Sequence, residues 1–187
     1  MGIDCKVTKK AVFLDRDGVI NRAVVRNGKP YPPDGPNDLE ILPGVSESLI
    51  RLKSAGFLLI VVSNQPDVAR GKTTLGTVVE INARLEKTLP IDQFRMCFHD
   101  GQEGCCCRKP LPGMLMDAAR EFGINLSESV MVGDRWRDME AGINAGCRTF
   151  FIDYGYDEKK PDRFDHKVNS LAEACEIILS DRQTSGT

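Results

Sequence analysis

Short apolar runs alternate along this chain with longer segments in which apolar residues recur at helical spacing. A short, uninterrupted apolar run is typical of a strand that is buried on both faces. The clearest run is at residues 57–62. Strands are predicted at residues 11–14, 57–62, 94–98, 130–132 and 149–152, and the pattern is weakest at 94–98.

Helices are predicted in the segments between and after these strands. After Pro43-Gly44, the side chains of Val45, Leu49 and Leu52 share one helical face, and Gly56 ends the pattern as glycine often does. The other helices are expected at residues 73–89, 112–122, 136–145 and 170–179. Glycine also follows the segments 112–122 and 136–145. Residues 183–187 are expected to fray.

Strands that alternate with helices predict a parallel sheet covered on both faces, because each crossover needs room for a helix. Right-handed crossovers make this a three-layer, doubly wound α/β fold. The 187 residues fit a single domain, with its core at about 10–180. No insertion after Asp17 or Ser63 is long enough for a large cap domain. The segment 21–42, rich in proline and glycine, is expected to form a local flap over the site.

Composition narrows the choice of function. A chain with 41% hydrophobic and 28% charged residues is an ordinary globular protein. Its net charge of −2 argues against a nucleic-acid-binding protein, which usually has a basic surplus. The first ten residues are too polar for a signal peptide, and no apolar run approaches the roughly 18 residues that span a bilayer. A cytoplasmic monomer without membrane or nucleic-acid partners is therefore expected.

Polar residues follow several predicted strands, where ligands of doubly wound folds bind. Asp15 and Asp17 follow the first strand and are separated by one residue, so their side chains point the same way in extended chain. Gly18 allows a close turn around whatever they hold. Asp-Gly is also a common surface turn, and the motif alone does not decide between the two interpretations. The strand at 130–132 repeats the arrangement, because Asp134 follows it and Asp138 lies four residues further on.

Other strand ends add to this pattern. Ser63 and Asn64 end the second strand, and Arg108 and Lys109 precede the helix at 112–122. If these strands are neighbours, carboxylates, a hydroxyl and cations converge at one edge of the sheet. Such a set suits Mg²⁺, which binds one or two carboxylates together with water and a substrate phosphate oxygen. Phosphoryl transfer requires mainly positioning and charge neutralisation from the protein.

A cluster of cysteines indicates a second metal site. Cys97 and His99 are followed by three consecutive cysteines, and three thiolates with one imidazole suit a tetrahedral structural zinc ion. Backbone alternation favours Cys105 and Cys107 as ligands, with Cys106 turned away. Free thiols in a flexible loop are the alternative.

The other acidic residues of this loop, the other cysteines and the second histidine are not expected to bind a metal. Asp100 and Glu103, within the same loop, are expected to be solvated charges. Cys5, Cys147 and Cys175 are expected to be reduced thiols. His166 is expected at the surface.

The chain resembles phosphatases of the haloacid dehalogenase superfamily, with the motifs of that superfamily in their usual order. Within it, the chain is similar to the heptose bisphosphate phosphatase group, which is related to the histidinol-phosphate phosphatases. The resemblance covers about residues 10–155. The segments that carry it are residues 12–18, 63–65, 69–72, 107–110 with 112–114, and 131–134 with Asp138.

The resemblance implies a role for each residue that matches a motif. Asp15 would attack phosphorus, and Asp17 would protonate the leaving oxygen and then activate water. Asp15, the backbone carbonyl of Asp17, and Asp134 would hold Mg²⁺. Ser63 and Lys109 would bind the oxygens of the transferred phosphoryl group.

Further residues would contact the substrate or support these groups. Asn64 would shape the pocket, and Arg108, Arg16 and Gln65 would contact the substrate or its phosphate. Arg135 stands where some relatives have lysine, and its planar fork differs from a point charge. Asp138 would contact the metal ligands rather than the ion. The family's pattern also assigns zinc to Cys97, His99, Cys105 and Cys107, and the sequence 65–67 departs from the more usual Gln-Ser-Gly.

The implied activity is removal of the C7 phosphate from a heptose bisphosphate through an aspartyl phosphate. A histidinol-phosphate phosphatase is the alternative enzyme, because the chemistry of the two would be the same. A nucleic-acid end phosphatase is disfavoured by the lack of a basic surplus. A zinc-stabilised binding module on an inactive fold is a further alternative, which the intact Asp15, Asp17, Lys109 and Asp134 disfavour.

Overall fold

A six-stranded parallel sheet forms the centre of the computed structural model, which describes residues 8–184. The strand order is β5-β4-β1-β6-β7-β8. These strands are β1 (Lys10–Leu14), β4 (Phe57–Asn64), β5 (Gln93–Cys97), β6 (Val130–Gly133), β7 (Arg148–Ile152) and β8 (His166–Val168). The chain builds outward from β1 to β5 and then returns to place β6 on the other side of β1. The carboxyl ends of β1 and β6 thus meet at the point where the winding reverses, where such folds bind ligands.

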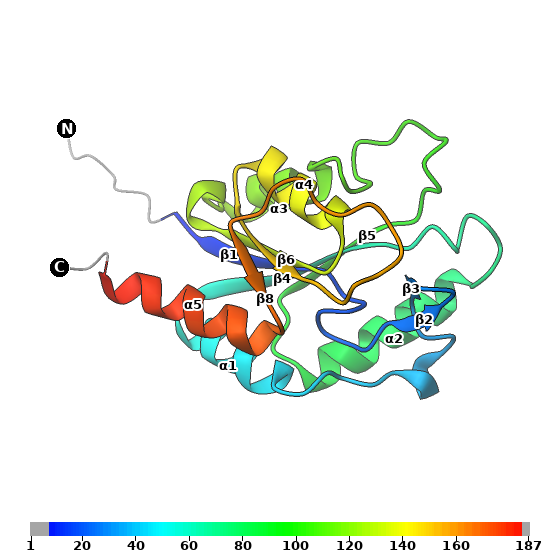
Figure 1. Cartoon of the computed structure of the whole chain (residues 1–187), viewed down its shortest axis with the longest axis horizontal. Coiled ribbons are helices and arrows are strands. Elements are labelled where there is room, and N and C mark those ends of the chain that lie inside the picture. Colours follow the sequence, from blue (N-terminus) through cyan, green and yellow to red (C-terminus); the bar gives the residue numbers. More distant parts are fainter. Residues whose placement is uncertain (1–7, 185–187) are drawn as a thin grey trace.

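Helices cover both faces of the sheet, as Figure 1 shows. Helices α1 (Val45–Ser54), α2 (Leu75–Thr88) and α5 (Leu171–Thr184) pack on one face, and α3 (Gly113–Phe122) and α4 (Trp136–Ala145) cover the other. Successive strand residues supply opposite layers, because side chains alternate along a strand. Val12 and Leu14 belong to the first core cluster, and Ala11 and Phe13 belong to the second.

The predicted three-layer α/β fold is therefore confirmed. Each predicted helix and strand is present, and most of their ends lie within two residues of the predicted ends. The structure also differs from the prediction in two places. The sheet has a sixth strand, β8, because a three-residue edge strand leaves no apolar run in the sequence. Helix α5 continues to Thr184, so residues 183 and 184 are helical rather than frayed. Residues 185–187 and Cys5 lie outside the described part of the chain.

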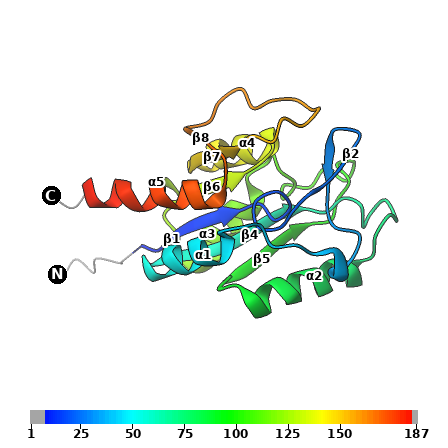
Figure 2. The same cartoon turned by 60° about the horizontal axis from the view of Figure 1, so that its bottom comes forward.

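The predicted flap at 21–42 contains a small hairpin of β2 (Val24–Arg26) and β3 (Lys29–Tyr31), followed by the 3-10 helix η1 (Pro36–Asp38). The turn is Asn27-Gly28, and both residues have positive φ (50° and 72°), as a two-residue hairpin turn requires. The backbone N–H of Asp157 donates to the Gly28 carbonyl at 2.8 Å. Figure 2 shows the hairpin beyond one end of the sheet, the same end from which the loop after β4 extends.

Among residues 8–184, no helix is both long and apolar enough to cross a bilayer.

Candidate active site

Three buried carboxylates meet where β1 and β6 end. Asp15 follows β1, Asp134 follows β6, and Asp138 lies in the first turn of α4. The backbone N–H of Asp15 donates to the Val132 carbonyl at 2.9 Å, which fixes the two strand ends side by side. One oxygen from each carboxylate lies within 4.8 Å of the other two. The prediction that these strand ends converge is confirmed.

Two glycines make room for this cluster. A Cβ atom at Gly18, whose φ is +91°, would lie 1.9 Å from Asp134 Oδ2. A Cβ atom at Gly133 would lie 2.1 Å from the Cβ atom of Asp138. Contacts this short do not occur between non-bonded atoms, so the carboxylates need glycine at both positions for steric reasons.

Lys109 supplies a cation inside the cluster. Its ammonium donates to Asp15 Oδ1 at 2.9 Å and to the Val62 carbonyl at 2.6 Å, and it pairs with Asp138 Oδ1 at 2.6 Å. Burial favours the neutral amine, but the charges of Asp138 and Asp15 outweigh it and raise the pKa of Lys109. Asn64 fixes the backbone here, because its side-chain amide donates to the Lys109 carbonyl and accepts from the Lys109 N–H.

One lysine does not balance three carboxylates. Burial, together with the charges of Asp15 and Asp138, raises the pKa of Asp134 well above its usual range. Both oxygens of Asp134 are buried without a well-formed hydrogen bond to any of residues 8–184, and the nearby Tyr156 hydroxyl lowers the pKa only in part. Burial also raises the pKa of Asp138 to about 6, although Lys109 opposes the shift. A buried carboxylate without donors is costly, and a bound cation removes that cost.

Asp17 is held at the edge of the cluster by side-chain donors. Its two oxygens accept from the guanidinium of Arg16 at 3.0–3.2 Å. Asn21 Nδ2 donates to Oδ1 at 3.0 Å, and Gln65 Nε2 donates to Oδ2 at 2.8 Å and to Ser63 Oγ at 3.1 Å. The carboxylate of Asp17 is therefore orientated from three directions.

Arg16 and Gln65 differ from their predicted role as substrate contacts. The side chain of Arg16 is fully buried, and its guanidinium also donates to Asn82 on α2. Gln65 is 2% exposed. Neither lines the cavity over the carboxylates. In this structure Arg16 positions Asp17, and Gln65 positions both Asp17 and Ser63.

A cavity of about 260 Å³ opens above the carboxylates. Among the predicted residues, its lining includes Asp15, Asp17, Asp138, Ser63, Asn64, Arg108, Lys109 and Arg135. Asp134 lies beneath this lining, and Arg135 pairs with Glu158.

Sequence reasoning missed part of the lining. Lys29 and Tyr31 come from the hairpin, Arg70 from the loop after β4, and Arg137 from the first turn of α4. Arg137 lies only two residues after Arg135, which was predicted, and this proximity was a signal for Arg137 that went unused. The segment of the hairpin was predicted as a flap over the site, but the sequence did not indicate which of its side chains line the cavity.

The cysteine loop brings four metal-type donors together beside this cavity. The Sγ atoms of Cys97 and Cys107 lie 3.2 Å apart, and those of Cys97 and Cys105 lie 3.9 Å apart. His99 Nδ1 is 3.5 Å from Cys97 Sγ and 3.3 Å from Cys107 Sγ. Bonds of about 2.3 Å to a tetrahedral zinc ion place two sulfurs roughly 3.8 Å apart, so the set is close to that geometry. Cys106 is exposed, as predicted.

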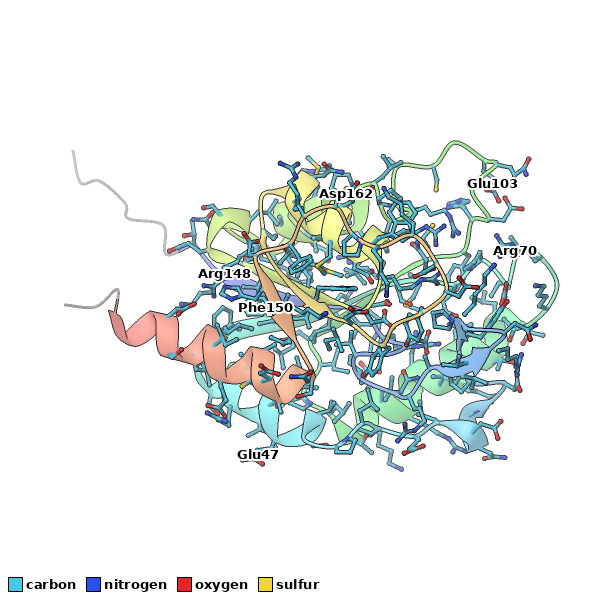
Figure 3. All side chains as sticks on the ribbon, viewed as in Figure 1. Glu47, Arg70, Glu103, Arg148, Phe150 and Asp162 are labelled. Carbon is cyan, nitrogen blue, oxygen red and sulfur yellow. The ribbon has the colours of Figure 1, made fainter. Side chains whose placement is uncertain are left out.

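The loop also carries contacts to the cavity. Arg108 Nη1 donates to the His99 carbonyl at 2.9 Å, and Arg70 Nη2 lies 3.5 Å from the Asp100 carbonyl. The Glu103 carboxylate accepts from its own backbone N–H and from those of residues 100–102, which lowers its pKa to about 2. Glu103 is exposed, as expected of a solvated charge, and its hydrogen bonds also organise the loop. Figure 3 shows Arg70 and Glu103 at the same end of the molecule.

Known proteins match this chain over most of its length. The HAD-hydrolase-like family model matches residues 106–174. The D-glycero-β-D-manno-heptose-1,7-bisphosphate 7-phosphatase of Bordetella bronchiseptica is 34% identical over 80% of this chain and 84% of its own length. The Helicobacter pylori protein of the same name is 38% identical over 74% and 80%.

A solved structure gives the same result. The heptose bisphosphate phosphatase of B. bronchiseptica, crystallised with magnesium and phosphate, superposes with a TM-score of 0.75 at 30% identity, covering 92% of this chain and 99% of that one. The chain therefore belongs to the D-glycero-β-D-manno-heptose-1,7-bisphosphate 7-phosphatase family of haloacid-dehalogenase-like hydrolases, and it is a phosphatase that acts on phosphoric monoesters.

Proposed function

We propose that this phosphatase removes the C7 phosphate of D-glycero-D-manno-heptose 1,7-bisphosphate with the help of Mg²⁺, through an aspartyl phosphate on Asp15. The observation that carries the proposal is the buried cluster of Asp15, Asp134 and Asp138 beneath a cavity that also receives Lys109 and several arginines. Such a site combines a nucleophile with groups that hold an anion. We also propose that the enzyme is a monomer and acts in the cytoplasm on a soluble sugar phosphate.

The donor set fits Mg²⁺. The ion prefers oxygen ligands, and within residues 8–184 the two Asp134 oxygens are buried without a well-formed hydrogen bond. Asp15, Asp134 and the backbone carbonyl of Asp17 are the proposed protein ligands, with Asp138 held behind them by Lys109. When bound, the ion neutralises charge on the phosphoryl oxygens and on the carboxylates.

The reaction begins with attack of the Asp15 carboxylate on phosphorus. The bond from phosphorus to the sugar oxygen breaks, and Asp17 gives its proton to that oxygen. Asp17 then takes a proton from a water molecule, whose oxygen displaces Asp15 and releases phosphate. Lys109 and Ser63 hold the transferred oxygens, and Lys109 already contacts Asp15. To act in this way Asp17 must release one of its present hydrogen bonds.

Zinc is proposed for the cysteine loop as a structural ion. Cys97, His99, Cys105 and Cys107 supply four donors, which is the complete set for such a site. The loop leads directly into Arg108 and Lys109, so an ion held there keeps both cations over the carboxylates.

The charge of the cavity bears on the choice between the two candidate substrates. Lys29, Arg70, Arg108, Arg135 and Arg137 line it. Histidinol phosphate has an ammonium group, which these cations repel, whereas a bisphosphate has a second anion, which they attract. A heptose bisphosphate is therefore the preferred substrate.

The test is phosphate release with Mg²⁺ from both anomers of heptose 1,7-bisphosphate, histidinol phosphate and common sugar phosphates. We expect kcat/KM for one heptose anomer to exceed the other substrates about a hundredfold, or ~2.7 kcal/mol. Flat, weak activity across the panel would reject the heptose assignment while leaving a phosphatase.

A further inference from the structure

Arg137 differs from the other arginines of the cavity. Arg135 pairs with Glu158, Arg70 pairs with Asp67, and Arg108 donates to a backbone carbonyl. Within residues 8–184, the guanidinium of Arg137 forms neither an ion pair nor a hydrogen bond, although it lines the cavity and is partly buried. A partly buried cation without an acceptor is costly, so its position calls for an explanation.

The ring of Trp136 holds Arg137 in place. The guanidinium carbon lies 4.7 Å from the ring centroid, which is within the range of a cation–π contact. Lys159 lies 4.5 Å from the same centroid and pairs with Glu140 and Asp162. Figure 3 shows Asp162 on the segment that passes over α4. The stacking occupies the face of the guanidinium and leaves its five N–H donors at the edge.

The surroundings of Arg137 are electropositive. Burial lowers the pKa of Arg137, and so do the charges of Arg135 and Arg108, which Glu158 and Asp138 offset only in part. The side chain stays charged, because arginine has by far the highest pKa of the basic side chains. Neighbouring guanidiniums that repel one another across an open cavity are stabilised by an anion that both contact.

We infer that Arg137 and Arg108 form a second phosphate subsite, which binds the phosphate group of the substrate that is not hydrolysed. This inference rests on the proposed function, because it assigns the second anion of a bisphosphate. The planar guanidinium of Arg137 can hold two phosphate oxygens at once. Arg137 is thus a specificity residue, and Trp136 is a positioning residue that acts through it.

The subsite has two consequences. A bisphosphate binds better than the matching monophosphate, because only the former reaches both ends of the cavity. The product keeps the second phosphate, so the same contact holds the product until it leaves.

The test compares Arg137→Ala and Arg137→Lys with wild type on heptose 1,7-bisphosphate and heptose 7-phosphate. We expect Arg137→Ala to lower kcat/KM for the bisphosphate by about tenfold to a hundredfold, mainly through KM, and to change the monophosphate by about twofold or less. Arg137→Lys should recover part of the loss, because it keeps the charge but not the fork. Trp136→Leu should act in the same direction as Arg137→Ala but more weakly.

Arg163→Ala is the matched control, because Arg163 is exposed, lies outside the cavity and has the same charge. It should leave both substrates unchanged. Equal losses on the bisphosphate and the monophosphate in Arg137→Ala, or no loss on either, would overturn the inference.

The proposed function can fail separately. If wild type does not hydrolyse the heptose pair, the same variants are compared on fructose 1,6-bisphosphate and fructose 6-phosphate. A wild-type preference for the bisphosphate that Arg137→Ala removes would support the subsite without the heptose assignment. Wild type without such a preference on either pair would overturn the subsite itself.

Discussion

Residues 8–184 contain two clusters of metal-type donors, and the two are built differently. Asp15, Asp134 and Asp138 are all buried and stand at strand ends or in a helix, where the sheet fixes them. Of the cysteine cluster only Cys97 is buried, at the end of β5, whereas His99, Cys105 and Cys107 are partly exposed and lie on a loop. The first cluster consists of hard oxygen donors and the second of sulfur and nitrogen donors.

The two clusters suit two different proposed roles of a metal ion, one catalytic and one structural. The carboxylates converge because β1 and β6 are neighbours, so their geometry exists before an ion binds and repulsion between them favours a cation. The cysteine donors lie mostly on a loop outside the sheet, so an ion that joins them would contribute to folding. Losing the first ion should stop chemistry and spare the fold, and losing the second should loosen a loop and impair chemistry indirectly.

The largest expected effect comes from Asp15→Asn, which removes the nucleophile and keeps the side chain's shape. We expect turnover to fall by roughly a thousandfold or more, with the circular dichroism spectrum and zinc content unchanged. Substantial residual activity after repurification would contradict the nucleophile assignment.

Gly18→Ala tests whether the fold fixes the carboxylates. The added Cβ would meet Asp134 Oδ2 at 1.9 Å, so the cluster must shift, and a shift of about 1 Å costs catalysis roughly a hundredfold. Gly71→Ala is the control, because Gly71 also has positive φ (+66°) but nothing lies within 4 Å of the new atom. Its kcat/KM should stay within about twofold of wild type. Equal activity of the two variants would show that the cluster tolerates displacement.

Cys107→Ser tests the loop. We expect zinc content to fall close to zero and kcat/KM to fall about tenfold to a hundredfold, because Arg108 and Lys109 follow directly. Cys106→Ser removes an exposed thiol from the same loop and should keep both properties. Metal analysis by mass spectrometry and steady-state kinetics make the measurement. Wild type that contains no zinc when purified without chelator would refute the zinc proposal.

The smallest effect concerns pH. Burial raises the pKa of Asp138 to about 6 and that of Asp134 well above its usual value, so lowering the pH from 7.5 towards 5.5 adds protons to the folded cluster. Those protons compete with Mg²⁺, and the half-saturating Mg²⁺ concentration should rise several-fold.

The same shifts fix the sign for stability. A carboxyl with a raised folded pKa destabilises the fold above that pKa, and this cost decreases as the pH falls from the folded pKa towards the unfolded value of about 3.9. Mg²⁺ should therefore raise the melting temperature more at pH 7.5 than at pH 5.5, with zinc content equal at both. An Mg²⁺ response that is the same at both values would place the titration elsewhere.

Much of the catalytic site was predictable from local sequence. The apolar runs placed Asp15, Ser63 and Asp134 at strand ends, and the parallel arrangement brings such ends to one edge. The alternation of the consecutive cysteines identified Cys106 as the exposed one. These predictions depend only on which way successive side chains point along a strand or extended segment, so they do not require knowledge of the tertiary structure.

The sequence by itself therefore determined the α/β class, the strand-end carboxylates and the cysteine set, because each depends on local periodicity. Only the tertiary structure decided that Arg16 turns inward to Asp17, and that Lys29 and Tyr31 of the predicted flap line the cavity. It also decided that Arg137 faces the cavity with neither an ion pair nor a hydrogen bond to any of residues 8–184. Those facts depend on contacts between segments distant in sequence, such as Arg16 with Asn82, and the direction of a polar side chain is set by which of those contacts it finds.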